Sequence, residues 1–196
     1  VALGGDLSRD LPAPRGGTRV PHGFARSDDF ARLELGTRWS INAAGPEGAK
    51  RARIEGGALV LLARGNGPQD GSLLTQNAGD HAYEIAVTME IEGGAEGGLL
   101  LFFNSRLFLG MGHNGASMIS YRGGKASHWR ESAPAVRLLE LRIVNDRNIV
   151  TMYYREPGQP WTRHAVRSEV SGYHANTIDD LASLRPALFA SGNGEV

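Results

Sequence analysis

The chain has 196 residues, enough for one domain with a substantial hydrophobic core. Lysine and arginine together number 21, as do aspartate and glutamate, so charge gives no reason to expect nucleic acid or an anionic membrane as a partner. The longest apolar run, residues 97–103, is far shorter than the ~20 residues of a membrane-spanning helix. The chain has no cysteine, which excludes disulfides and thiolate metal ligands and leaves both a secreted and a cytosolic location open.

Residues 1–27 differ in composition from the rest of the chain. They are rich in glycine, proline and arginine and show neither helical nor strand periodicity. We expect them to form a linker that leads from a preceding domain. From residue 28 to residue 196, short apolar runs alternate with glycine pairs and polar turns every ~8 to 15 residues, which predicts an all-β sandwich of two antiparallel sheets.

The first strands are predicted from turns and alternation. Gly56 and Gly57 stand between two β-compatible runs, which is a signal for a two-residue hairpin. The stretch HAYEIAVTMEIEGG, residues 81–94, alternates apolar with polar residues and predicts a strand with one buried face. Its apolar row is Tyr83, Ile85, Val87, Met89 and Ile91.

Further strands follow in the second half of the chain. Residues 97–103 are continuously apolar, the chain turns at Asn104 and Ser105, and the apolar run resumes at Leu107, which predicts a central hairpin covered on both faces or lining a closed sandwich. Residues 136–166 predict three more strands, with turns at 145–148 and 157–160. In the first of these strands the predicted core row is Arg137, Leu139, Leu141 and Ile143.

The C-terminal region predicts one helix and one strand. In residues 176–184, Ile178, Leu181 and Leu184 recur about every third position, and Asp179 and Asp180 suit a first helical turn. A last strand begins at residue 185. A sandwich that ends with it would have an unpaired edge, so we expect a closing strand beyond residue 196 or from elsewhere.

Motifs of common enzyme classes are absent from the sequence. GMGHNG, residues 110–115, imitates a phosphate-binding loop but follows a predicted strand and opens no helix, which favours a glycine turn. No two histidines have metal-ligand spacing, and no ExDxxE run, typical of catalytic sandwiches, occurs. We expect no cofactor, and Asp28 and Asp29 are the weak candidates for a structural calcium ion, against the alternative of solvated carboxylates.

Aromatic side chains offer the best candidates for ligand binding, because a sugar ring can stack on an aromatic plane. The stretch SYRGGKASHWRES gathers Tyr121, His128 and Trp129 around a glycine turn with several cations. It predicts a sugar-binding or interdomain contact, with core packing as the alternative. In MYYREPGQPWTRHAV, by contrast, the turn before Trp161 favours a packed hairpin, and alternation places Tyr153 and Tyr154 on opposite faces.

Five segments together resemble a known family. They are VPHGFARSDDFARLELGTRWSI, GLLLFFNSRLFLGMG, LRIVNDRNIVTMYYREPGQPWTRH, SGYHAN and LRPALFASGNGEV. In this order they resemble the C-terminal concanavalin A-like jelly-roll β-sandwich of glycoside hydrolase family 43 (GH43), the β-xylosidase and α-arabinofuranosidase group. The likeness extends over residues 20–196.

The resemblance implies a two-domain glycosidase acting on xylo- or arabino-oligosaccharides. The catalytic carboxylates of that family lie in an N-terminal five-bladed propeller, so no catalytic residue is carried over to this chain. In some relatives the sandwich sends a residue toward the substrate pocket, and Tyr173, His174 and Asn176 of the SGYHAN stretch are our candidates here. Family sandwiches also continue with one more strand after GEV.

Three hypotheses remain open from the sequence. The leading one is an accessory, non-catalytic sandwich that packs on and supports the propeller. The alternative is an autonomous carbohydrate-binding module. A complete enzyme on a concanavalin-like sandwich is disfavoured by the missing ExDxxE run.

Overall fold

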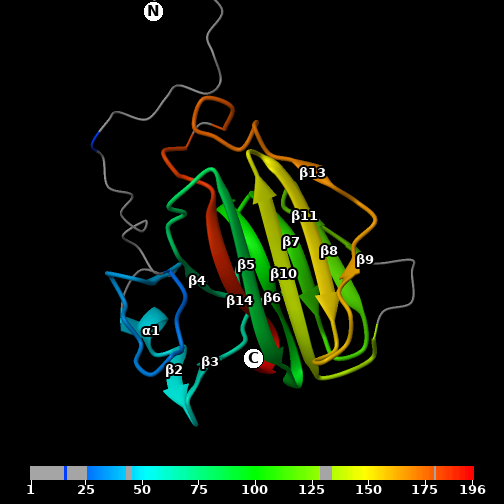
Figure 1. The fold of residues 1–196 in the computed structure, drawn as a ribbon. Helices are drawn as coiled ribbons and strands as arrows, with labels where there is room; N and C mark the ends of the chain where they lie inside the picture. The colour runs from blue at the N-terminus through cyan, green and yellow to red at the C-terminus, as the bar shows by residue number, and fades with distance from the viewer. Residues whose placement is uncertain (1–15, 17–25, 43–45, 129–133, 179) are drawn as a thin grey trace, which may run out of the picture.

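The computed structural model describes residue 16 and residues 26–42, 46–128, 134–178 and 180–196. It confirms the predicted all-β sandwich of antiparallel sheets (Figure 1). The larger sheet contains, in spatial order, β1 (Ser40–Ile41), β4 (Ser72–Thr75), β14 (Arg185–Glu195), β6 (Glu92–Asn104), β7 (Leu107–His113), β8 (Met118–Arg122) and β9 (Lys125–His128).

The smaller sheet lies in front of the larger one in Figure 1. Its order is β12 (Thr162–Arg163), β11 (Ile149–Arg155), β10 (Leu138–Asp146) and β5 (Ala82–Glu90), and β13 (Ser168–Glu169) also pairs with β11. Beside the sandwich lie the β2–β3 hairpin (Ala52–Glu55 and Ala58–Leu61) and the short helix α1 (Pro46–Ala49). No helix of the described residues is long and apolar enough to cross a membrane.

The alternating rows of β5 and β10 face the larger sheet, as predicted, except at Arg137, which precedes β10 and is exposed, whereas Val136 packs against the core. Leu141 pairs with Val87 and Ile143 pairs with Ile85, so the two apolar rows lie on the same face. Leu141 and Ile143 are completely buried in the main hydrophobic cluster. Because a strand repeats every two residues, alternation in the sequence is enough to predict this face.

The central hairpin of β6 and β7 is buried on both faces, which also confirms the prediction. Leu99 and Leu101 face the smaller sheet, whereas Leu100 and Phe102 belong to a second buried cluster on the other face. The turn forms at Asn104, whose Oδ1 accepts hydrogen bonds from the N–H groups of Arg106 and Leu107, both at 2.9 Å. This local bond explains why the apolar run stops at an asparagine.

The predicted Gly-Gly turn is also present. Gly56 and Gly57 have φ values of 59° and 79° and join β2 to β3. Arg53 of this hairpin donates two hydrogen bonds to Glu195 of β14, at 3.1 and 2.8 Å. That arginine holds the pKa of the Glu195 carboxyl below its usual value.

The prediction that the last strand forms an open edge is wrong. β14 lies between β4 and β6, and it pairs with β6 along its whole length. Its end also bonds to the chain after β3, because the Ala63 N–H donates to the Gly194 carbonyl at 2.9 Å. The larger sheet therefore has β1 and β9 as its edges, and a strand beyond residue 196 stays a prediction.

The predicted helix at 176–184 is wrong for the residues that the structure describes there. The segment has one turn, in which the N–H groups of Thr177 and Ile178 both bond to the His174 carbonyl. Leu181, the centre of the expected apolar face, is 99% exposed. A helix this short needs a surface on which to bury its apolar face, and Leu181 finds none.

His113, at the end of β7, is a buried histidine with both ring nitrogens in use. Nδ1 accepts from the Gly115 N–H at 2.9 Å, which leaves Nε2 to donate to the Pro134 carbonyl at 2.8 Å. Burial lowers the pKa of the imidazole below its ordinary value, although the Pro134 contact partly opposes this. The first four residues of GMGHNG, predicted as part of a glycine turn, thus form the end of strand β7. The neutral ring of His113 connects this strand end to the following loop through its two hydrogen bonds.

The first prediction compares two leucines. Leu141→Ala should lower the free energy of unfolding by ~2 to 5 kcal/mol, because it leaves a cavity in a completely buried site. Leu181→Ala should change that free energy by less than ~0.5 kcal/mol, since its side chain is exposed. Urea denaturation measures both changes in the free energy of unfolding. A decrease for Leu181→Ala as large as that for Leu141→Ala would contradict the exposed position of Leu181.

The second prediction concerns pH. The pKa of His113 is lower in the folded chain than in the unfolded chain, so the imidazole takes up a proton more readily when the chain is unfolded. The free energy of unfolding should therefore fall as the pH drops below ~6.5, the ordinary pKa of histidine. The stability advantage of the wild type over His113→Asn should therefore shrink between about pH 7.5 and about pH 5.5. The matched control is His174→Asn, at an exposed histidine. A difference that is constant over this pH range, or an equal change in the control, would contradict the prediction.

Candidate functional site

The two sequence stretches predicted to carry function contact each other in the fold. Gly123 and Gly124, with φ values of 58° and 74°, form the turn between β8 and β9. The Gly123 N–H donates to the hydroxyl oxygen of Tyr173 at 3.2 Å. The turn of SYRGGKASHWRES and the SGYHAN loop thus lie side by side, which alternation could not have predicted.

The β6–β7 turn supports both stretches. The Gly124 N–H donates to the Phe108 carbonyl at 3.0 Å, and a Cβ at Gly124 would collide with the backbone carbonyl of Arg106. Asn104 donates through Nδ2 to Asp180 at 2.6 Å, which ties the 171–184 loop to the same turn. We call the described residues of these three segments, 104–107, 122–125, 171–178 and 180–184, the loop end.

Tyr173 connects the loop end to the hydrophobic core. Its ring is half-buried and packs against the main hydrophobic cluster. Burial raises the pKa of the phenol, and the Gly123 hydrogen bond and the charge of Arg122 partly oppose that rise. Tyr173 therefore stays protonated at neutral pH and positions the loop, with little of its ring free for a ligand.

His174 and Asn176 are the exposed polar side chains beside Tyr173. The Nε2 atom of His174 lies 3.1 Å from the Thr177 hydroxyl, which orients the ring within the loop. Both side chains are accessible, so they fit the predicted role of contacting a sugar or a neighbouring domain.

Tyr121 is buried, whereas the predicted sugar or interdomain contact requires an exposed side chain. Its side chain is 4% exposed and belongs to the second hydrophobic cluster, with ring centroids 5.6 Å from Phe108 and 5.7 Å from Phe189. Its hydroxyl donates to the Glu96 carboxylate. Burial, followed by the Glu96 charge, raises the pKa of Tyr121 well above its ordinary value. This tyrosine is buried architecture in the described fold and offers no stacking face.

The other two aromatic candidates of this stretch are described only in part. The backbone of His128 pairs with Ile119 at the end of β9. Trp129 lies outside the described residues, as do residues 130–133. Their predicted contact with a ligand or domain stays a prediction.

A second aromatic group covers the outer face of the smaller sheet. The Arg142 guanidinium lies 4.4 Å from the Tyr153 ring centroid and 4.5 Å from that of Trp161. Arg155 lies 4.3 Å from the same Trp161 ring, and its Nε donates to Glu140. These rings are stacked with guanidinium groups, which confirms the packed-hairpin interpretation of Trp161. Tyr154 lies on the opposite face, as predicted, and is buried.

The two weak calcium candidates form hydrogen bonds within the chain. Asp28 accepts from the Trp39 indole at 2.8 Å and from the Phe30 N–H at 2.9 Å, and Arg38 lies 3.3 Å away. Burial raises the pKa of Asp28, but these three partners together lower it below its usual value. The described residues contain no group of three or more acidic, histidine or cysteine side chains that could hold a metal, so calcium stays a sequence prediction.

The sequence did not predict the hydrogen bonds that Glu96, Asn104 and Asp180 form at these sites. Glu96 had a visible signal, because it is a carboxylate inside the otherwise apolar GAEGGLLLFF stretch. Asn104 and Asp180 are 76 positions apart, and nothing in either stretch indicates the pairing.

Comparison with known proteins finds solved structures that are similar to this chain but no matching sequence family. No protein-family model matches the chain, and no curated protein matches it. Among solved structures, the GH43 protein BlXynB of Bacillus licheniformis is 17% identical, with a TM-score of 0.69 over 85% of this chain and 35% of its own. A xylan β-1,4-xylosidase of Bacillus halodurans is 13% identical, with a TM-score of 0.68 over 96% of this chain and 41% of its own.

A bifunctional GH43-CE protein of Bacteroides eggerthii is also similar, at 18% identity and a TM-score of 0.67, over 87% of this chain and 25% of its own. The chain therefore spans between a quarter and two fifths of the length of these structures. At such identities the likeness shows the fold. The chain has the β-sandwich fold that forms one part of these larger GH43 chains, and the predicted resemblance is confirmed at that level.

Proposed function

We propose that this chain is the accessory, non-catalytic β-sandwich of a glycoside hydrolase that acts on xylo- or arabino-oligosaccharides. Catalysis would be performed by a five-bladed propeller domain in the same polypeptide. The observation that carries the proposal is the fold, which recurs in one part of larger GH43 chains.

Three carboxylates on the sheets have partners within the domain, which agrees with a non-catalytic role. Glycoside hydrolysis needs two carboxyl groups that face one another across a cleft. Glu96 bonds to Tyr121, Glu140 bonds to Arg155, and Glu195 is held by Arg53. Each of these carboxylates on the sheets thus has a partner within the domain.

We place the contact with the propeller or its substrate at the loop end. This segment presents His174 and Asn176 on a loop fixed by the Tyr173 and Asp180 hydrogen bonds. A rigid loop with exposed polar side chains can line the rim of a neighbouring pocket without paying a large ordering entropy. The sandwich would then stabilise the propeller and shape its substrate pocket.

The alternative is an autonomous carbohydrate-binding module. What favours it is the closeness of His174 and Asn176 to the cationic β8–β9 turn, since polar side chains can bind sugar hydroxyls. The described aromatic side chains argue against a binding module, because Tyr121 is buried and the Trp161 ring contacts two arginine side chains.

A third prediction separates these proposals on the chain of residues 1–196. It should not hydrolyse aryl β-xylosides or aryl α-arabinofuranosides, and calorimetric titration with xylan and arabinan fragments should give no saturable heat. Turnover would overturn the non-catalytic assignment. Saturable binding that is lost in Trp129→Ala and kept in Trp161→Ala would favour the binding module.

A fourth prediction tests the loop end in the complete natural polypeptide. The double variant His174→Ala, Asn176→Ala should lower kcat/KM for xylo- or arabino-oligosaccharides by about tenfold, because the pocket rim loses positioning contacts. The matched control is Glu156→Ala, Gln159→Ala in the exposed turn after β11. Equal effects of the two double variants, or no effect of either, would contradict the placement.

A further inference from the structure

A polar pocket lies where β5 begins and where β10 turns into β11. It has a volume of about 440 Å³, within the ~300 to 1,000 Å³ of small-molecule sites. Leu184, the last residue of the loop end, forms part of its wall, so the pocket adjoins that surface. Most of the wall consists of hydrogen-bonding side chains, which are Asp80, His81, Tyr83, Asn145 and Asn148.

Asn145 is a polar side chain in an apolar row. It continues the core-facing row of Leu139, Leu141 and Ile143 on β10, and it is 6% exposed. Its Nδ2 donates one long hydrogen bond, of 3.4 Å, to the His81 carbonyl, and its Oδ1 has no hydrogen-bond partner among the described residues. A buried amide with open hydrogen-bonding capacity is costly and uncommon, so it indicates a site that a ligand completes.

The carboxamide of Asn145 can turn toward the pocket that it lines. Its Oδ1 is shielded from solvent in the described conformation, and only the long bond to His81 holds the group. A hydrogen bond of this length is weak, so a better partner displaces it at little cost. Two neighbouring hydroxyl groups of a sugar are such a partner, because one donates to Oδ1 while the other accepts from Nδ2.

Tyr83 supplies an aromatic surface beside this amide. It is the pairing partner of Asn145 on β5, and its ring is half-buried. Burial raises the pKa of the phenol, and the Asn145 side chain partly opposes that rise. The hydroxyl of Tyr83 is therefore protonated at neutral pH and can donate to a ligand, while the ring offers a face to the C–H groups of a sugar.

The turn between β10 and β11 forms the rim of the pocket. The Arg147 N–H donates to the His81 carbonyl at 3.0 Å, and the Val170 N–H donates to the Asn148 carbonyl at 2.9 Å. These bonds fix the turn against β5 on one side and against the segment after β13 on the other. Asn148 has a φ of 78° and an exposed side chain, so its amide is held at the rim on a rigid backbone.

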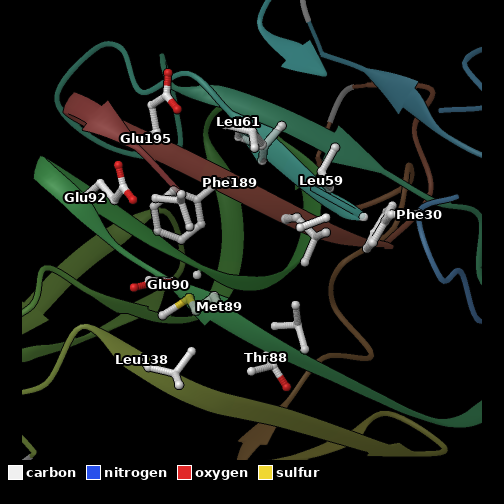
Figure 2. Close-up of a pocket in the computed structure, with 17 residues that line it drawn as sticks. Phe30, Leu59, Leu61, Thr88, Met89, Glu90, Glu92, Leu138, Phe189 and Glu195 are labelled. Carbon is white, nitrogen blue, oxygen red and sulfur yellow. The ribbon is translucent and has the colours of Figure 1, made fainter. Parts of the chain in front are cut away.

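The lining favours a neutral ligand with several hydroxyl groups. No lysine or arginine occurs among the described residues that line the pocket, so it offers no cation to a phosphate or a carboxylate. The cavity of about 460 Å³ beside Val87–Glu90 differs, because its lining is largely apolar, with glutamates at one end (Figure 2). Amide, phenol and imidazole groups, by contrast, both donate to and accept from hydroxyl groups.

We propose that the pocket at the β10–β11 turn binds one neutral sugar ring, with Asn145 and Asn148 holding hydroxyl groups and Tyr83 lying against the ring. The proposal goes beyond the function given above, because this chain alone forms the site. One pentose ring has about ten non-hydrogen atoms, so we expect a Kd of about 10 mM. Binding this weak gives no saturable heat in the calorimetric titration described above, so a more sensitive method is needed.

Proton–nitrogen correlation NMR of the chain of residues 1–196 tests the proposal, with D-xylose and L-arabinose as probes. The amide signals of residues 80–84 and 145–149 should shift and saturate with a Kd of about 10 mM for at least one of them. Asn148→Gly should raise this Kd at least about fivefold, because it removes a hydroxyl partner and keeps the positive φ. Arg147→Gly is the matched control and should leave the Kd unchanged, since Arg147 also has a positive φ, 47°, but does not line the pocket.

A second variant removes the buried amide. Asn145→Leu continues the apolar row of β10 and should abolish the shifts, because leucine can neither donate nor accept a hydrogen bond. Where this variant fails to fold, the comparison of Asn148→Gly with Arg147→Gly decides the matter.

Three outcomes would overturn the proposal. They are the absence of saturable shifts with either sugar, an unchanged Kd in Asn148→Gly, and shifts confined to residues 171–178 of the loop end. Glycerol that binds as tightly as the sugars would show a site for any small polyol and would overturn the sugar assignment. These readouts are independent of the function proposed above, which fails instead if the chain hydrolyses aryl glycosides or if the two double variants have equal effects.

Discussion

The pairing of β6 with β14 is the contact on which the rest of the sandwich depends. The two strands pair from Phe102 with Arg185 to Glu92 with Glu195, and no other pair of strands shares a longer ladder in the described residues. β4 and β1 join the larger sheet only through β14, and the β2–β3 hairpin is fixed to its end by Arg53. The attachment of these strands therefore depends on a pairing between segments far apart in the sequence, and non-local pairings of this kind slow folding.

Much of this fold could be predicted because the physical signals are local. A strand with one buried face must alternate, so β5 and β10 were recognisable from their own residues. Gly56 and Gly57 predict their turn because the positive φ values that it needs are unfavourable for other residues. The buried hairpin of β6 and β7 was visible as a continuous apolar run with one asparagine turn.

The parts that could not be predicted depend on distant partners. Whether β14 is an edge or a central strand is decided by β4 and β6, and its own residues do not show it. Leu181 has the spacing of a helix, but a face is buried only where another element covers it, and no element of the described residues covers this leucine. Tyr121 was expected at the surface because its hydroxyl partner, Glu96, lies 25 positions earlier on another strand. Tyr173 and Gly123 were both in predicted stretches, but their contact spans 50 positions.

The described surfaces of the sandwich divide into regions with different chemistry, and this division limits what each can bind. On the outer face of the smaller sheet, the Arg142 and Arg155 guanidinium groups contact the Tyr153 and Trp161 rings, so at least part of the aromatic surface is occupied within the domain. The cavity beside Val87–Glu90 of β5 has a largely apolar lining, with Glu90, Glu92 and Glu195 at one end (Figure 2). The loop end presents the exposed polar side chains of His174 and Asn176 together with the exposed Leu181, and its anchor, Tyr173, packs against the main hydrophobic cluster. The cavity beside β5 and the loop end are therefore formed by different segments and offer different chemistry, an apolar lining at one and exposed polar side chains at the other.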